Sequence, residues 1–140
     1  MKSGFVKIIL SVLLIASVLS LFGCGDRVKR DEAKETVESF LSAVSEENYE
    51  LAAEFLHPDK AYDVEALIER IESELFVDFG KGVEVERYHD FSSSYYDSDV
   101  DGSDYSFEMS VRIGGILTEL EISVVRNDGG YGIYSIEFED

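Results

Sequence analysis

The sequence from residue 107 to residue 124 reads FEMSVRIGGILTELEISV, and its alternation decides the fold. Apolar residues recur at every second position on both sides of Gly114 and Gly115. A strand places alternate side chains on opposite faces, and a pair of glycines permits the tight turn of a hairpin. The stretch therefore predicts two antiparallel strands that share one apolar face. That face is predicted to contain Phe107, Met109, Val111, Ile113, Ile116, Thr118, Leu120, Ile122 and Val124.

The period of two continues on both sides of this hairpin. Val83 and Val85 open an earlier strand, and Tyr134, Ile136 and Phe138 alternate with polar residues in a last one. A long link is expected between the first strand and residue 107. Its aromatic residues either contact a partner from a flexible segment or cover the sheet as part of a wide hairpin. These aromatics are Tyr88, Phe91, Tyr95, Tyr96 and Tyr105.

Ahead of the strands, apolar residues recur at helical spacing. The first predicted helix has a row of apolar residues on one face between residues 37 and 44. A second helix fits residues 48–56 and ends before Pro58. A third helix fits residues 63–75, with Asp63 as its N-terminal cap. An antiparallel sheet with one apolar face needs a cover, and these stripes are the apolar surfaces that can supply it. The sequence thus predicts an α+β fold, with N-terminal helices packed on an antiparallel β-sheet, in one domain spanning residues 31–140.

The amino terminus has the layout of a secretory signal peptide. Lys2 and Lys7 precede an uncharged apolar stretch from residue 8 to residue 22. This stretch is shorter than the roughly 20 apolar residues that a membrane-spanning helix needs. Residues 1–23 are therefore expected to be a signal peptide.

The apolar stretch ends in LFGC at residues 21–24. This junction resembles the lipobox of bacterial lipoproteins, in which a small residue precedes a cysteine that receives lipid before cleavage. The resemblance implies that Cys24 is lipidated and that residues 24–30 form the lipidated cysteine and a tether. The expected location is the extracytoplasmic face of the cell membrane. The alternative is an uncleaved signal anchor with an incidental cysteine.

The charge of the mature chain limits its partners. Cleavage before Cys24 leaves 117 residues (140 − 23), and removing Lys2 and Lys7 leaves 10 basic residues against 30 acidic ones, a net charge of −20. Such a charge disfavours nucleic acid as a partner and leaves membrane affinity to the lipid. With one cysteine in the chain, no internal disulfide can form.

Two further stretches carry a family resemblance. Residues 37–44 (VESFLSAV) and 49–58 (YELAAEFLHP) resemble the opening helical hairpin of the nuclear transport factor 2-like superfamily. Residues 120–138, with NDGGYGIY at 127–134, are similar to its final hairpin. The resemblance covers residues 31–140 and implies a cone-shaped sheet wrapped around a helix, with a pocket or a closed core inside. Some members, such as ketosteroid isomerase and scytalone dehydratase, are enzymes, and many only bind ligands or partners.

An enzyme of this kind needs an acid or base with a shifted pKa inside the cone. The resemblance assigns none, so no catalytic residue is predicted. The residues weighed for this role are His57, Asp78, Tyr88, His89 and Asp90.

The two histidines also have structural interpretations. His57 fits a corner that ends a helix. His89 shares strand parity with Val83 and Val85, so an unbroken strand aims it inward, whereas one bulge aims Tyr88 inward instead. The histidines lie far apart and lack ligand spacing, which disfavours a zinc site.

One segment matches the calcium loop of EF-hand proteins. Asp97, Asp99 and Asp101 precede Gly102, and Glu108 occupies the twelfth position. In such loops the carboxylates converge on one ion and the last glutamate binds through both oxygens. Calcium is thus the one cofactor that the sequence suggests. The alternative is an acidic hairpin loop, because the flanking residues do not read as helices.

Together these patterns favour a membrane-anchored, extracytoplasmic lipoprotein whose domain is a non-catalytic binding module. Its expected partners are the membrane, through lipid on Cys24, and an envelope protein or a small apolar ligand. A homodimer through the sheet is a further option. The alternatives are an isomerase- or dehydratase-like enzyme with its site in the cone, and a weakly calcium-responsive module.

Overall fold

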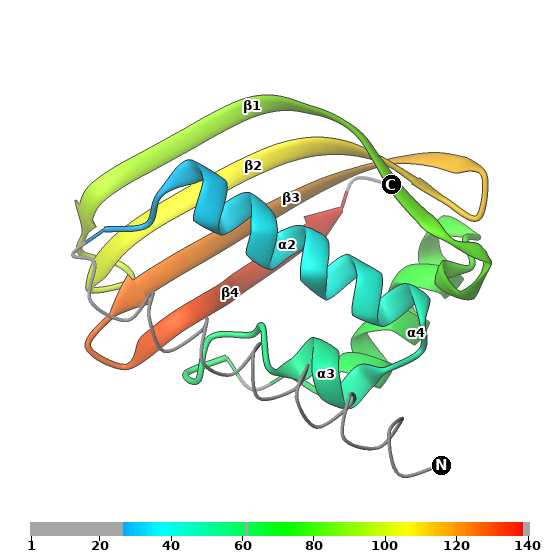
Figure 1. The fold of residues 1–140 in the computed structure, drawn as a ribbon, viewed down its shortest axis with the longest axis horizontal. Helices are drawn as coiled ribbons and strands as arrows, with labels where there is room; N and C mark the ends of the chain where they lie inside the picture. Colours follow the sequence, from blue (N-terminus) through cyan, green and yellow to red (C-terminus); the bar gives the residue numbers. More distant parts are fainter. Residues whose placement is uncertain (1–26, 61, 139–140) are drawn as a thin grey trace, which may run out of the picture.

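A computed structural model describes residues 27–60 and 62–138 of the chain, in which helices come first and a sheet follows (Figure 1). The helices are α2 (Arg30–Ser45), α3 (Tyr49–Ala53) and α4 (Val64–Leu75), followed by the short 3-10 helix η2 (Phe79–Lys81). The strands are β1 (Val83–Asp97), β2 (Gly102–Ile113), β3 (Ile116–Asn127) and β4 (Gly130–Phe138). The α+β class expected from the sequence is confirmed. Within the described ranges, no helix has the length and apolar character needed to cross a membrane.

The four strands form one antiparallel sheet in the order β1-β2-β3-β4. The hairpin read from residues 107–124 is confirmed, because Ile113 pairs with Ile116 across the two glycines. The sheet curves, and α2 lies across its concave side (Figure 1). We call this the inner side of the sheet and the opposite face the outer side.

The helical stripes fill the inner side. Phe40 of α2 is 1% exposed, and Phe107, Met109 and Ile122 of the sheet are fully buried in the same apolar cluster. Ile71 of α4 is 1% exposed in that cluster. The three helix and strand faces predicted to be buried are therefore buried.

The helix ends follow the sequence at α4 and differ at α3. Asp63 caps α4 by accepting the backbone N–H of Ala66. The helix predicted for residues 48–56 stops at Ala53 instead. The chain beyond it leaves the helix because its backbone pairs with β4: His57 donates to the Ile133 carbonyl at 2.9 Å, and Ile133 donates to the Phe55 carbonyl at 2.8 Å.

The predicted long aromatic link is wrong. β1 continues to Asp97 and β2 begins at Gly102, so only residues 98–101 connect them. Tyr88 and Tyr105 pack their rings against Phe107, with centroids 5.3 and 4.9 Å away. The alternative of a wide hairpin whose aromatics cover the sheet is confirmed for these two residues. Tyr95 and Tyr96, by contrast, are 68% and 61% exposed.

Two residues that were predicted for the buried face of the sheet, Tyr134 and Ile116, are not buried there. A bulge shifts the register so that Val124 pairs with Ile133, and the fully buried residue of this part of β4 is Ile133 rather than Tyr134. Ile116, predicted for the inner side, is 47% exposed because it follows directly after the glycine turn, at the end of the hairpin.

Candidate functional site

The residues weighed as catalytic groups are dispersed over the fold. Asp78 is exposed at the start of η2, where its side chain accepts the backbone N–H of Gly80 at 2.9 Å. Asp90 is exposed on β1, and its side chain accepts the N–H of Phe91. Both carboxylates thus satisfy local backbone groups at the surface, and neither lies in the apolar cluster.

His57 is the one candidate that is fully buried. Its Nδ1 accepts the backbone N–H of Asp59 at 3.0 Å. Because Nδ1 accepts, Nε2 carries the proton of the neutral ring and donates toward Asn127 Oδ1 at 2.9 Å and the Gly130 carbonyl at 3.1 Å. The imidazole therefore fastens the corner after α3 to the β3-β4 hairpin. This geometry agrees with the corner interpretation of His57.

The close approach of this corner to β4 explains one glycine of the NDGGYGIY stretch. A Cβ atom on Gly132 would lie 2.5 Å from the His57 backbone nitrogen, and the residue has φ +156°. A side chain cannot be accommodated there without displacing the backbone. The glycine is thus required for packing of the corner against β4.

The structure shows which of Tyr88 and His89 faces the inner side of the sheet. The β1-β2 register shifts between Val85 and Arg87 and again between Tyr88 and Asp90. Tyr88 consequently packs against the core and His89 points to the outer side, as the bulge alternative requires. Burial, followed by the hydrogen bond to Glu38, raises the pKa of the Tyr88 hydroxyl above its ordinary value.

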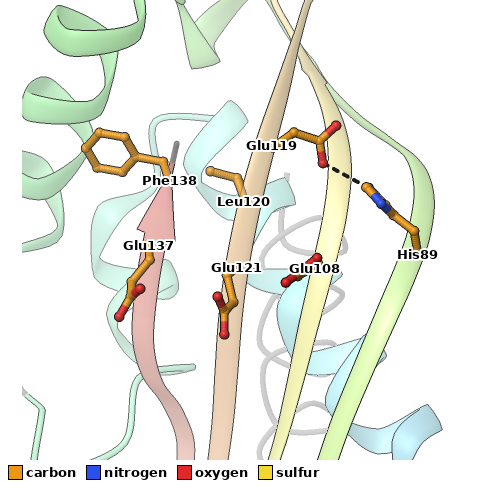
Figure 2. A pocket seen from close by; sticks show the side chains of 7 residues that line it. All are labelled: His89, Glu108, Glu119, Leu120, Glu121, Glu137 and Phe138. Carbon is orange, nitrogen blue, oxygen red and sulfur yellow. Dashed lines mark ion pairs between the residues drawn. The ribbon is translucent and has the colours of Figure 1, made fainter. Parts of the chain in front are cut away.

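His89 belongs to a shallow groove on the outer side, with a volume of about 270 Å³ (Figure 2). Its Nε2 lies 2.8 Å from Glu119 Oε2, and the Ser110 hydroxyl donates to the other Glu119 oxygen at 2.7 Å. Three more carboxylates line the groove, which gives it a strongly acidic surface. These belong to Glu108, Glu121 and Glu137.

A second groove is more apolar and lies between α4 and β4, with a volume of about 500 Å³. Leu67 and Ile136 form its apolar walls, and Arg70 and Glu137 stand at its rim with Tyr62. The Arg70 guanidinium lies 5.7 Å from the centre of the Phe138 ring. This groove combines apolar contact area with a few charged groups, as ligand and partner sites do.

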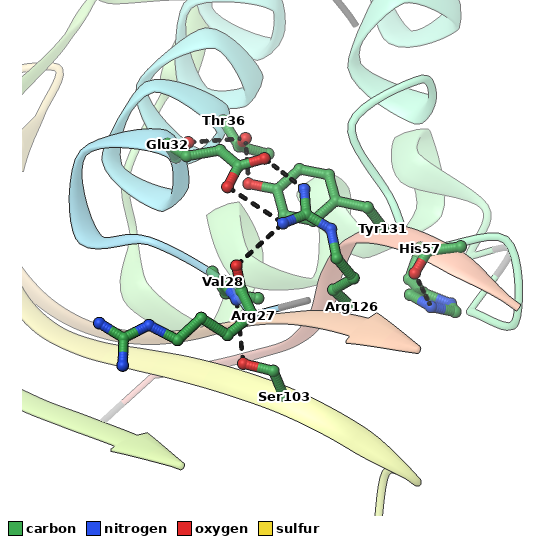
Figure 3. A network of polar contacts seen from close by, with 9 residues as sticks. Arg27, Val28, Glu32, Thr36, His57, Ser103, Arg126 and Tyr131 are labelled. Atoms are coloured by element: carbon green, nitrogen blue, oxygen red, sulfur yellow. Dashed lines mark hydrogen bonds and ion pairs between the residues drawn. The ribbon is translucent and has the colours of Figure 1, made fainter. Parts of the chain in front are cut away.

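Sequence reasoning missed a buried polar network at the start of α2 (Figure 3). The guanidinium of Arg126 on β3 pairs with Glu32 of α2 through two hydrogen bonds, and their side chains are only 10% and 8% exposed. Arg126 also donates to the Arg27 carbonyl at 3.0 Å and stacks over the Tyr131 ring at 4.5 Å. The Tyr131 hydroxyl lies 2.8 Å from Thr36 Oγ1.

The network fixes the first described residues to the sheet. Val28 is 4% exposed, and its N–H donates to Ser103 Oγ on β2 at 2.9 Å. The folded part thus already includes Val28, within the segment 24–30 that the sequence suggested as a tether. No local sequence pattern predicts this network, because Glu32 and Arg126 are 94 residues apart in the chain.

The residues of the predicted calcium loop occupy two places. Asp97, Asp99 and Asp101 lie at the β1-β2 turn, where the Asp97 side chain accepts the N–H of Asp99 and the Asp101 side chain accepts the hydroxyl of Tyr96. Glu108 lies within β2, paired with Asp90 and Glu121. Among the described residues, no group of three or more acidic, histidine or cysteine side chains is arranged to hold a metal ion.

Cys24 and the predicted signal peptide lie outside the described residues. Comparison of the chain with known protein families, with curated proteins and with solved structures finds no match. The functional argument therefore depends on the residues themselves.

Proposed function

We propose that this chain is a membrane-anchored, extracytoplasmic lipoprotein whose α+β domain is a non-catalytic binding module. The observation that carries the anchor is the LFGC junction after a short apolar stretch, with Cys24 as the single cysteine. Among the described residues the first buried one is Val28, four residues after Cys24, so an anchor at Cys24 would lie next to the folded part.

The binding role is supported by how the sheet is filled. The inner side is occupied by apolar side chains from α2 and α4, and the buried imidazole of His57 is committed to holding a corner. The apolar groove between α4 and β4 offers an open surface for an envelope protein or a small apolar ligand. The enzyme alternative would need an acid or base beside an apolar pocket, whereas Asp78, His89 and Asp90 are at the surface.

The nuclear transport factor 2-like cone is part of the same proposal. Helices precede a curved four-stranded meander, and α2 crosses its concave side, in the manner that the resemblance implies (Figure 1). Members of one fold perform different functions, so the binding role rests on the grooves and the anchor rather than on the fold.

Metabolic labelling with a fatty-acid analogue tests the anchor. The wild-type chain is expected to carry label and to be cleaved, whereas Cys24→Ala carries no label and accumulates as the precursor. Ser20→Ala, which changes the same region and keeps the thiol, is the matched control and should label as the wild type does. Equal label on wild type and Cys24→Ala would overturn the proposal.

Mass spectrometry of small molecules that copurify with the lipidated chain tests the groove. Leu67→Gln introduces a polar group into the groove wall and is expected to remove the bound molecule. Leu75→Gln, on the same helix and outside the groove lining, is the matched control and should retain it. Equal retention by both variants would contradict a ligand site in this groove.

A further inference from the structure

The chain enters the fold at a fixed place, at the end of the sheet where β1 ends and β2 begins. Val28 donates to Ser103 Oγ at 2.9 Å, and the Ser103 hydroxyl donates to the Ser94 carbonyl at 3.2 Å. Arg126 holds the carbonyl of Arg27 from the other flank. The position of the chain at Arg27 and Val28 is thus set by hydrogen bonds to β2 and β3.

The distance from this entry point to Cys24 is short. Only two residues separate Cys24 from Arg27, and three Cα steps of 3.8 Å span at most about 11 Å. A lipid on Cys24 would therefore keep Arg27 within about 11 Å of the residue that the membrane holds. An attachment this short brings this end of the sheet close to the bilayer.

The charge at this end differs from that of the whole chain. Arg27, Lys29 and Arg30 are exposed within four residues, although the mature sequence has only 10 basic residues in all. They line a shallow pocket of about 430 Å³ together with the serine and tyrosine side chains of the adjoining strand ends. Tyr95 lines this pocket and is 68% exposed.

The acidic β1-β2 turn occupies a separate part of the same end. Asn127 Nδ2 donates to the Val100 carbonyl at 2.8 Å, which holds residues 98–101 against the end of β3. The basic segment lies instead beside Ser93, Ser94 and Tyr95 of β1. Asp31, which lines the same pocket, is 3.5 Å from Arg30, Glu32 is buried against Arg126, and Asp26 precedes Arg27 in the sequence.

We propose that Arg27, Lys29 and Arg30 dock this end of the domain onto anionic phospholipid headgroups, with Tyr95 at the membrane interface. The inference rests on the proposed lipidation of Cys24 and adds an orientation to it. Basic side chains are attracted to the surface of an anionic membrane, and tyrosine favours the interface. Exposed carboxylates at the far end of the sheet, such as Glu84 and Glu86 near the start of β1, are repelled by the same surface.

Tryptophan fluorescence tests the orientation, because the sequence contains no tryptophan. Tyr95→Trp places a single tryptophan beside the basic segment. Phe76→Trp is the matched control, because Phe76 is 85% exposed and precedes β1, whereas Tyr95 lies near the other end of that 15-residue strand. The lipidated full chain is placed in vesicles with about one third phosphatidylglycerol, doped with a headgroup-level quencher lipid.

We expect quenching in Tyr95→Trp to exceed that in Phe76→Trp severalfold, with a smaller difference in phosphatidylcholine vesicles. Arg27→Gln/Lys29→Gln/Arg30→Gln should bring the two quenching values within about a factor of two of each other, because it removes the three attractions that favour this orientation. Lys60→Gln/Lys81→Gln/Arg87→Gln removes the same charge elsewhere and should leave the preference unchanged.

The intact mass of the protein distinguishes a failure of the proposed orientation from a failure of the proposed lipid anchor. If the lipid mass is present and both tryptophans are quenched equally, the orientation is overturned and the lipoprotein proposal stands. If the preference is the same in both lipids and in both triple variants, the headgroup contact is overturned. A protein without the lipid mass overturns the proposed anchor, and with it the orientation.

Discussion

The two sides of the sheet use neighbouring residues of the same strands for opposite purposes. On β2, Phe107 and Met109 are fully buried on the inner side, while Glu108 between them is exposed on the outer side. The inner side gains stability from apolar burial, and the outer side concentrates carboxylates in a groove with His89. An ion pair on the inner side should therefore affect the free energy of unfolding much more than an ion pair on the outer side.

The first prediction compares an ion pair from each side. The Glu32 to Arg126 pair is almost fully buried, so Glu32→Gln leaves a buried guanidinium without its counter-charge and should lower the free energy of unfolding by about 3 to 5 kcal/mol. The His89 to Glu119 pair is partly exposed at 32% and 42%, and Glu119→Gln should cost less than about 1 kcal/mol. Denaturant titration of both variants measures the difference.

A double variant sharpens this test. Glu32→Leu combined with Arg126→Met removes both buried charges, and it should be more stable than Glu32→Gln alone. Equal midpoints for Glu32→Gln and Glu119→Gln would show that the buried pair is as solvated as the surface pair, which would contradict the comparison.

The second prediction removes apolar volume from the inner side. Phe40→Ala, Ile71→Ala and Ile122→Ala should each destabilise by roughly 2 to 5 kcal/mol, because each truncates a side chain that is at most 1% exposed. Glu137→Ala, at an exposed position on β4, is the control and should stay within about 0.5 kcal/mol. An unchanged unfolding midpoint for any of the three would place its side chain outside the core.

The inner side could be predicted from sequence because its signal is periodic. The period of two in β2 and β3 and the helical stripes of α2 and α4 identify the buried positions directly, as Phe107 and Phe40 illustrate. β1 was underestimated because most of its residues beyond Val85 are exposed, which removes the apolar alternation. The bulges that turn Tyr88 and Ile133 inward depend on pairing with neighbouring strands and leave no local pattern.

The polar sites were harder to predict than the core. A buried pair such as Glu32 and Arg126 arises when distant elements meet, and neither residue differs in sequence from an ordinary surface charge. The apolar groove between α4 and β4 depends likewise on how Leu67 and Ile136 are brought together. His57 shows the same limit, because its corner position was predicted whereas its bonds to the distant β3-β4 hairpin were not.

The third prediction uses the tyrosine of the buried network. Burial is the main cause that raises the pKa of Tyr131 above 10.0. The contribution of Tyr131 to the free energy of unfolding is therefore fully present below pH 10. Above pH 10 the unfolded chain loses the hydroxyl proton while the folded chain keeps it, so the free energy of unfolding falls by up to about 1.4 kcal/mol per pH unit. Tyr131→Phe removes this contribution, so its stability should fall less steeply with pH.

Urea denaturation between about pH 9 and pH 11 measures this slope. At neutral pH, Tyr131→Phe loses the contact with Thr36 and should cost about 1 kcal/mol. Tyr95→Phe, at a 68% exposed position, is the matched control and should keep the wild-type slope. Parallel pH profiles for wild type and Tyr131→Phe would contradict the prediction.

The last and smallest effect concerns calcium at the β1-β2 turn. A single site of this kind should have a dissociation constant on the order of 0.1 to 1 mM. At about 1 mM calcium it would add only about 0.4 to 1.4 kcal/mol to the free energy of unfolding. Asp97→Asn/Asp99→Asn should abolish this increment, because both carboxylates lie at the turn.

Glu108 distinguishes the two ways in which the segment could bind the ion. The twelve-residue loop pattern needs Glu108 as a bidentate ligand, but β2 pairs it with Asp90 and Glu121 and buries its neighbour Phe107 completely. Bringing Glu108 to the turn would break these strand pairings, which costs more than about 1.4 kcal/mol of binding can offset. We therefore expect Glu108→Gln to keep the calcium-dependent melting shift. Loss of the shift in this variant would show that the loop forms at the expense of the strand, and no heat up to about 10 mM calcium would leave an acidic hairpin alone.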